Sequence, residues 1–176
     1  GVAYCRACFK ERPTPLLAAT VLPACAEIYF QGKDEAVAAC AFEMADWLCE
    51  RQYSPANCTN RAWLGGFKPA GGGMPTAESA ACTAALASAV KLTRAVPDLA
   101  RFGTYRGAAV DGLGFVRGLQ YTDESADHFE KGYRGRYLVG GVRSAVSDAT
   151  LRVDSSALAV AAYVGYLESG GERTAD

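Results

Sequence analysis

The chain has 176 residues, half of them hydrophobic, and a formal net charge of -1. A chain of this length buries a core large enough to fold without disulfides or a bound metal. Acidic and basic residues are interspersed, so the sequence has no basic patch of the kind that binds nucleic acids. We therefore expect a single domain over residues 1–176 and no nucleic-acid partner.

The apolar stretches are too short or too interrupted for a membrane span, which takes about 20 consecutive apolar residues. Pro23 and Glu27 interrupt the first stretch, and the stretch 157–167 is far shorter than a span. We therefore expect no transmembrane segment. The first residues carry neither a basic region nor a cleavage signature, so the localisation is left open.

The cysteines are seven, an odd number, which does not suit a disulfide framework. Four of them lie in alanine-rich stretches where a thiol acts as a small hydrophobe: Cys25, Cys40, Cys49 and Cys82. This usage favours a reducing compartment such as the cytoplasm. Cys5 and Cys8 form a CxxC, but no second pair follows and His128 is the only histidine, which argues against zinc. We interpret the CxxC segment as a frayed N-terminal turn and predict neither a metal nor a cofactor.

The first two expected helices lie on either side of a tight turn. Residues 16–30 are apolar enough for a helix, although Pro23 should kink it or mark its first turn. Residues 31–33 then predict a reversal of the chain. The second helix spans 34–52, with Asp34 as its N-cap and acidic residues opposite a face of apolar residues at helical spacing.

Three further helices are expected over 76–94, 97–120 and 154–168. The third has an alanine-rich body, and the fifth begins at Asp154, which occupies an N-cap position. The fourth contains five glycines, each of which costs up to about 1 kcal/mol relative to alanine in a helix. We interpret these glycines as points of close approach to neighbouring helices: Gly103, Gly107, Gly112, Gly114 and Gly118.

The connections between the expected helices alternate in length. Residues 31–33 and 95–97 are short connections, whereas 53–75 and 121–153 are long. Helices joined by short turns run antiparallel, so both long loops must emerge at the same end of the molecule. That end is the candidate functional face, because rigid scaffolds carry binding residues on long loops.

The second long loop repeats the first. Gln52 is followed by residues 63–67 with the sequence WLGGF, and Gln120 is followed by residues 138–142 with the sequence LVGGV. The unit is a helix, a loop with a Gly-Gly turn and a second helix, and it occupies approximately residues 34–94 and 98–169. Such units bury their apolar faces only by stacking on neighbours.

This order of helix, glutamine, Gly-Gly turn and helix resembles the repeats of the α/α-toroid superfamily, which includes terpenoid cyclases, protein prenyltransferases and many carbohydrate-active enzymes. The resemblance covers residues 15–167 and implies an all-α fold of antiparallel helical hairpins, arranged as part of a two-layered ring. Five helices would be less than half of a closed ring. The DxDD motif of squalene-hopene cyclisation is missing, and the zinc ligands of the prenyltransferases cannot be assembled, so no activity carries over.

The candidate site lies on the long loops and offers acids, cations and aromatic side chains. The predicted catalytic residues are the acids, since a pair of carboxylates serves glycosidic-bond chemistry: Glu78, Asp148 and Asp154. The predicted substrate-binding residues are aromatic platforms, which suit a sugar face or a polyprenyl chain, and cations: Trp63, Phe67, Tyr137, Arg143 and Arg152. No metal ligand is predicted.

Each candidate also has a structural interpretation. Asp154 and Glu78 lie at helix starts, where a carboxylate stabilises free N–H groups and the positive end of the helix dipole. Arg152 and Arg143 are expected to pair with Asp154 and Asp148 across the loop. Asp148 has no capping explanation and is therefore the most interesting of the three acids.

Three functions stay open at this stage. The first is part of an α/α-toroid enzyme that acts on a carbohydrate, as a hydrolase, lyase or epimerase. The others are a terpenoid-cyclase-like or prenyltransferase-like protein and a non-catalytic helical-repeat binding module. The expected partners are a small-molecule or glycan substrate and, on exposed apolar flanks of the first and last helices, the rest of the ring or a second copy of the chain.

Overall fold

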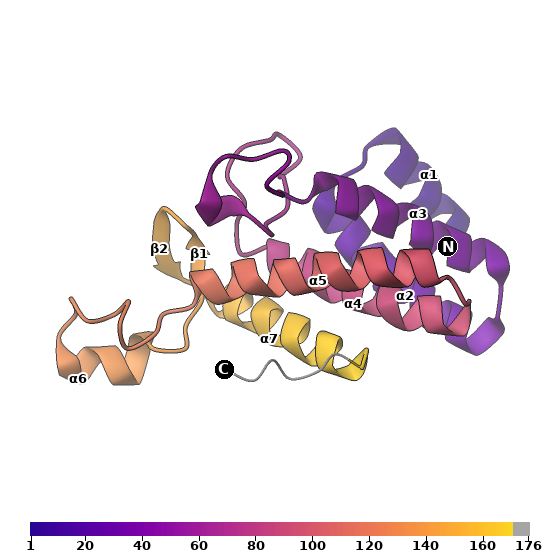
Figure 1. Ribbon diagram of the computed structural model, residues 1–176. Coiled ribbons are helices and arrows are strands. Elements are labelled where there is room, and N and C mark those ends of the chain that lie inside the picture. Colours follow the sequence, from indigo (N-terminus) through magenta and orange to yellow (C-terminus); the bar gives the residue numbers. More distant parts are fainter. Residues whose placement is uncertain (171–176) are drawn as a thin grey trace.

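The computed structural model describes residues 1–170, and the chain is all-α apart from one small sheet (Figure 1). The described part contains six helices of ten or more residues: α1 (Val2–Glu11), α2 (Pro15–Gly32), α3 (Glu35–Arg51), α4 (Ser79–Ala95), α5 (Leu99–Leu119) and α7 (Val153–Glu168). None of the described helices is long and apolar enough to cross a membrane. The all-α prediction is therefore confirmed.

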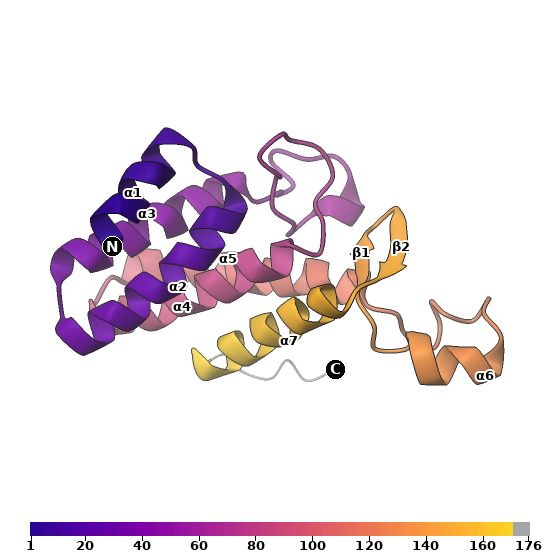
Figure 2. The same cartoon turned by 180° about the vertical axis from the view of Figure 1, so that it is seen from behind.

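The long helices form two layers (Figures 1 and 2). In one layer α4 lies between α2 and α7 and packs against both. In the other, α3 and α5 each pack against the helix that precedes them in the chain, α2 and α4. The long loops that follow α3 and α5 both lie at the same end of the molecule, as predicted from the alternating connections.

The core is built around α4, whose alanines let the neighbouring helices approach closely. Leu86, Val90 and Leu92 are almost fully buried, and so are the alanines between them. Gly112 of α5 sits directly on Thr83, since a Cβ added there would lie 2.3 Å from the threonine hydroxyl. The volume of side chains at these positions therefore sets the spacing between layers.

Two helices start at an aspartate N-cap, and a left-handed residue ends a third helix. Asp34 accepts the amide of Ala36 at 2.8 Å, and Asp98 accepts the amide of Arg101 at 3.0 Å. Lys33 closes α2 in the left-handed conformation, with φ of 55°. The predicted reversal after the first long helix is therefore confirmed.

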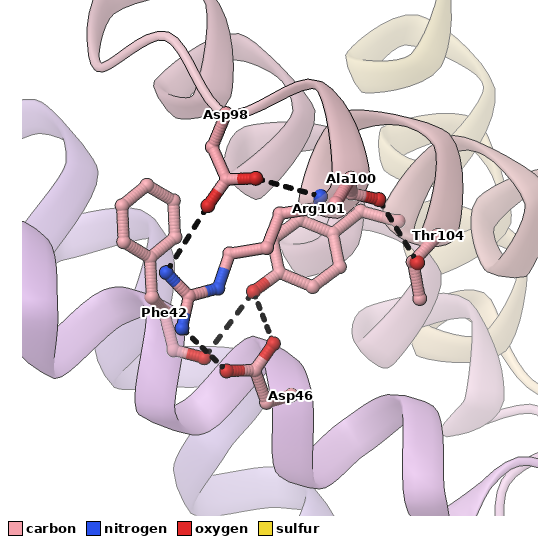
Figure 3. A network of polar contacts seen from close by, with 7 residues as sticks. Phe42, Asp46, Asp98, Ala100, Arg101 and Thr104 are labelled. Carbon is pink, nitrogen blue, oxygen red and sulfur yellow. Dashed lines mark hydrogen bonds and ion pairs between the residues drawn. The ribbon is translucent and has the colours of Figure 1, made fainter.

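A polar cluster ties α3 to α5 (Figure 3). The buried Tyr105 hydroxyl donates to the Asp46 carboxylate at 2.5 Å, and the Arg101 guanidinium donates to the other carboxylate oxygen at 3.1 Å. Arg101 also bonds Asp98 at 3.3 Å and lies over the ring of Phe42, 4.9 Å from its centroid. Burial and the Asp46 carboxylate raise the pKa of Tyr105, which keeps the hydroxyl protonated as a donor.

Several sequence-based expectations were wrong. The CxxC segment is not a frayed turn but part of α1, which Phe9 anchors against Trp47 with ring centroids 5.4 Å apart. Pro23 does not mark the first turn of α2, because the helix begins at Pro15 and contains Pro23 in its interior. The third long helix begins at Ser79 rather than Thr76.

The second long loop is more structured than the sequence indicated. It contains the short helix α6 (Lys131–Tyr133), the π-helical turn η2 (Arg134–Leu138) and the antiparallel strands β1 (Arg143–Ala145) and β2 (Asp148–Leu151). The first long loop contains only a short 3-10 turn, η1 (Arg61–Trp63).

The expectation for the glycines of the fourth predicted helix holds at one position. Only Gly112 is in close contact with a neighbour, Thr83. A Cβ added at any of the other four would meet no atom within 4 Å: Gly103, Gly107, Gly114 and Gly118. These four lie on surface that the described residues leave open.

Candidate functional site at the loop end

The first long loop is closed at its base by backbone hydrogen bonds around the Gly-Gly turn. The Tyr53 amide donates to the Gly66 carbonyl at 2.8 Å, and the Gly65 amide donates back to the Tyr53 carbonyl at 2.9 Å. The next amide, that of Phe67, donates to the Ser79 hydroxyl at 3.1 Å. The turn requires glycine, because Gly65 has φ of +83°.

The second long loop is closed by the same bonds. The Tyr121 amide donates to the Gly141 carbonyl at 2.9 Å, and the Gly140 amide donates to the Tyr121 carbonyl at 2.8 Å. The Val142 amide donates to the Ser156 hydroxyl at 3.3 Å, and Gly140 has φ of +90°. The two Gly-Gly turns therefore match bond for bond, and Ser156 corresponds to Ser79.

The two loops also meet each other. The Ala77 amide donates to the Ser144 carbonyl at 2.8 Å, and Thr76 forms an isolated bridge with Ala145 of β1. The helices α2, α4 and α7 all begin at this end (Figures 1 and 2). The loop end is thus a single surface built from both Gly-Gly units.

A small cavity of about 110 Å³ lies where the first loop crosses the starts of α2 and α4. Two of the eight predicted site residues, Glu78 and Phe67, line it. The rest of its wall is mixed in polarity and includes Thr14, Pro15, Pro69, Thr76, Ser79 and Cys82. Sequence reasoning missed Thr14, although Thr14-Pro15 is a helix-start signature, and its hydroxyl accepts the Leu17 amide at 3.1 Å.

Glu78 is the residue directly before the first turn of α4, and it is exposed. Its side chain makes no capping hydrogen bond, in contrast to the structural interpretation of this residue. Its backbone amide donates to the Thr76 hydroxyl at 3.3 Å. The carboxylate of Glu78 therefore has no capping role, although the residue lines the cavity.

Asp154 is held by an arginine, as its structural interpretation predicted. Arg152 donates two hydrogen bonds to its carboxylate, at 2.9 and 2.6 Å. These bonds lower the pKa of Asp154 to about 2. Arg152, rather than Asp154, occupies the N-cap position, because α7 begins at Val153.

Asp148 was the most interesting acid in the sequence, and the structure explains it as a turn residue. It lies exposed at the start of β2, where its carboxylate accepts the Thr150 amide at 3.0 Å. Hydrogen bonding to Thr150 lowers the pKa of Asp148. The predicted pair with Arg143 is wrong: Arg143 instead donates to the carbonyls of Gly118 and Leu119 at the end of α5, at 2.8 and 3.3 Å.

The aromatic candidates do not gather around one cavity. Trp63 is half-buried against Tyr53, with ring centroids 5.5 Å apart, and Phe67 belongs to the core at 3% exposure. Tyr137 is about half exposed and stacks on Tyr133 at 5.0 Å. The segment that carries these two tyrosines projects beyond β1 and β2, away from the first loop (Figure 1).

A second, larger hollow of about 400 Å³ lies between α1 and the start of α3. Sequence reasoning missed it because α1 was not expected. Its cations are already near an acid, since Arg6 pairs with Glu43 at 2.7 Å and Lys10 lies 3.7 Å from the same carboxylate. Within residues 1–170, no three side chains of histidine, cysteine, aspartate or glutamate are grouped so as to hold a metal ion.

Comparison with known proteins found no family model, no curated protein and no solved structure that matches this chain. The function is therefore inferred from its own side chains and their geometry.

Proposed function

We propose that the loop end binds a carbohydrate, with Glu78 as the carboxylate that accepts its hydroxyl groups. The observation that supports this most is the position of Glu78: it lines a cavity between the starts of α2 and α4, and its side chain makes no capping bond. Thr76 and Ser79 line the same cavity, and each of their hydroxyl groups already accepts one backbone amide. Such a wall suits a ligand rich in hydroxyl groups, since each polar contact needs a partner of its own.

An isoprenoid ligand is less well supported. A terpenoid-cyclase-like or prenyltransferase-like protein needs a cavity that is almost entirely apolar and aromatic. The cavity beside Glu78 is lined by two threonines, a serine and the acid as well as by Leu16, Ala70 and two prolines, and Phe67 is the one aromatic residue among the described residues that line it. The polarity of this wall therefore favours a carbohydrate over a polyprenyl chain.

Residues 1–170 support binding more than they support hydrolysis. Glycoside hydrolysis uses two carboxyl groups about 5–10 Å apart, one of which stays protonated to act as the acid. Asp148 and Asp154 have lowered pKa values, which makes both poor acids. We therefore propose a helical-repeat binding module; as part of a larger toroid enzyme, it would supply Glu78 and need its second carboxylate from another segment.

The test compares Glu78→Gln with Asp154→Asn in the full chain. A glycan array identifies the carbohydrate that binds, and titration calorimetry then gives its Kd for each variant. We expect Glu78→Gln to weaken binding about 10- to 100-fold, the usual effect of losing a charge-assisted hydrogen bond, and Asp154→Asn to leave it unchanged. If no glycan binds, or if both variants bind as the wild type does, the proposal is wrong.

A further inference from the structure

The two Gly-Gly units can be compared position by position, because Ser79 and Ser156 accept the same hydrogen bond. In α4 the residues one, four, eight and eleven places after Ser79 are buried, with exposures of 0 to 1%: Ala80, Thr83, Ala87 and Val90. In α7 the corresponding residues are all exposed: Ala157, Val160, Val164 and Leu167. The last three are 62, 46 and 45% exposed. The same helix face is therefore covered in one unit and open in the other, although its residues are apolar in both apart from Thr83.

The helix that covers much of this face of α4 is α5, which follows it after a short turn. Gly112 of α5 packs on Thr83, the counterpart of Val160. The helix α7 covers part of the same face, since a Cβ built on Gly165 would lie 3.6 Å from the Cβ of Ala87. Among the described residues, no helix packs against α7 in the position that α5 takes against α4.

The first Gly-Gly turn is also covered by α5. A Cβ on Gly65 would lie 2.0 Å from the Asp111 carbonyl oxygen and 3.3 Å from Phe115. A Cβ on Gly140, the matching glycine, would meet no atom within 4 Å. Both turns have the same conformation, so only the covering helix differs.

The repeated glutamine shows the same difference. Gln52 donates its amide hydrogens to two carbonyls, that of Gly65 at 2.9 Å and that of Ala108 in α5 at 2.8 Å. Gln120 donates to the matching Gly140 carbonyl at 3.1 Å. Among residues 1–170 no carbonyl stands in for that of Ala108.

From these three differences we infer that the open face formed by Val160, Val164, Leu167, Gly140 and Gln120 is the docking surface for one further helix of the same repeat. This helix runs antiparallel to α7 and follows it in the same polypeptide, as α5 follows α4. It passes close to Val160, presents a backbone carbonyl to Gln120 and covers the Gly140 turn. The inference does not depend on what the loop end binds.

The test extends the full chain at its C-terminus with a copy of residues 97–120, the segment that covers α4. We expect the extension to raise Tm by on the order of 5 °C, and Val160→Lys in the extended chain to abolish the rise. Ile28→Lys, which introduces the same charge at an apolar position of α2 with 45% exposure, should leave the rise in place.

A second measurement reports on the surface without relying on stability. A Val160→Cys thiol should be alkylated about ten times more slowly in the extended chain than in the original one, as followed by peptide mass spectrometry, while an Ile28→Cys thiol should not slow. An extension that changes neither Tm nor the alkylation of the Val160→Cys thiol would overturn the inference. So would an original chain that sediments as a dimer and is made monomeric by Val160→Lys, because the face would then belong to a second copy.

Discussion

Gly65 and Gly140 have the same backbone conformation in different surroundings. Replacing either by alanine forces a Cβ into the left-handed region, which costs about 1–2 kcal/mol. Only Gly65 is also pressed against α5, where the new Cβ would overlap the Asp111 carbonyl. Overpacking of this kind costs a further 1–3 kcal/mol, roughly.

The two glycines therefore form a matched pair of variants. We expect Gly140→Ala to lower the free energy of unfolding by about 1–2 kcal/mol and Gly65→Ala to lower it by about twice as much. Urea unfolding followed by circular dichroism measures both. Equal losses of unfolding free energy in the two variants would mean that α5 shifts away from the new Cβ at Gly65 without further cost.

What the sequence revealed about single residues depended on how local their interactions are. Asp34 and Asp98 cap helices that begin one residue later, and both were predictable from a pattern a few residues long. Arg143 reaches carbonyls at the end of α5, 24 and 25 residues away in the chain, and no local pattern indicates that partner. Glu78 was predicted at the site, but its cavity depends on Thr14 from a distant helix.

At the scale of the helix, α4 carries a buried thiol whose ionisation should lower the stability of the fold at alkaline pH. Cys82 is 2% exposed, and its burial raises the pKa of the thiol from about 9 to about 12. A thiol with a raised pKa in the folded state stabilises the fold fully below its unfolded pKa, and this stabilisation is lost as the pH rises from 9 to 12.

We therefore expect the free energy of unfolding to fall above pH 9, and Cys82→Ala to reduce the slope by up to about 1.4 kcal/mol per pH unit. Denaturant unfolding at pH 8 and pH 10.5 measures this difference. Cys58→Ala controls for removing a thiol as such, since it takes one from the first long loop instead of the core. An unchanged slope in Cys82→Ala would show that this thiol does not couple ionisation to folding.

Elements with a long apolar period were predictable, and those held by a few contacts were not. The second predicted helix, over 34–52, matches α3 because its apolar face repeats over four turns. By contrast, α1 spans only ten residues and has one buried side chain, Phe9. The strands β1 and β2 have three and four residues, and a pairing of that length gives no alternation to detect.

At the scale of the whole molecule, stability should be unevenly distributed. Within residues 1–170, α4 is packed by α2, α3, α5 and α7, whereas the main contacts of α1 are with α2 and α3. Native-state hydrogen exchange should therefore show amides of α4 exchanging through global unfolding and those of α1 through local opening.

The variant Phe9→Ala separates these two processes. Loss of the one buried side chain of α1 should remove protection from residues 2–11 and leave α4 almost unchanged. If the exchange of α4 amides rises in step with that of α1, the molecule opens as a single unit and the expected gradient is absent.

The arrangement of the whole was predictable in its topology and not in its fine contacts. Alternating short and long connections correctly placed both loops at one end, because helix direction follows from connection length. The convergence of three acids on one cavity did not follow from that placement. Asp148 instead accepts a bond from Thr150, and Asp154 accepts bonds from Arg152. These partners depend on the conformation of the loop, which a sequence pattern does not reveal.

The tip of the first long loop has a practical consequence. Residues 71–73 are three exposed glycines, and a side chain built on any of them would meet no atom within 4 Å. The base of the loop is tied by backbone bonds, from Tyr53 to the Gly-Gly turn and from the Lys68 amide to the Arg51 carbonyl at 2.9 Å, whereas the tip is joined to Tyr53 by a bond from its hydroxyl to the Gly73 carbonyl at 2.7 Å. A protease nick at the tip would thus leave both fragments assembled, and the same position would accept an inserted reporter domain or the new ends of a circular permutant.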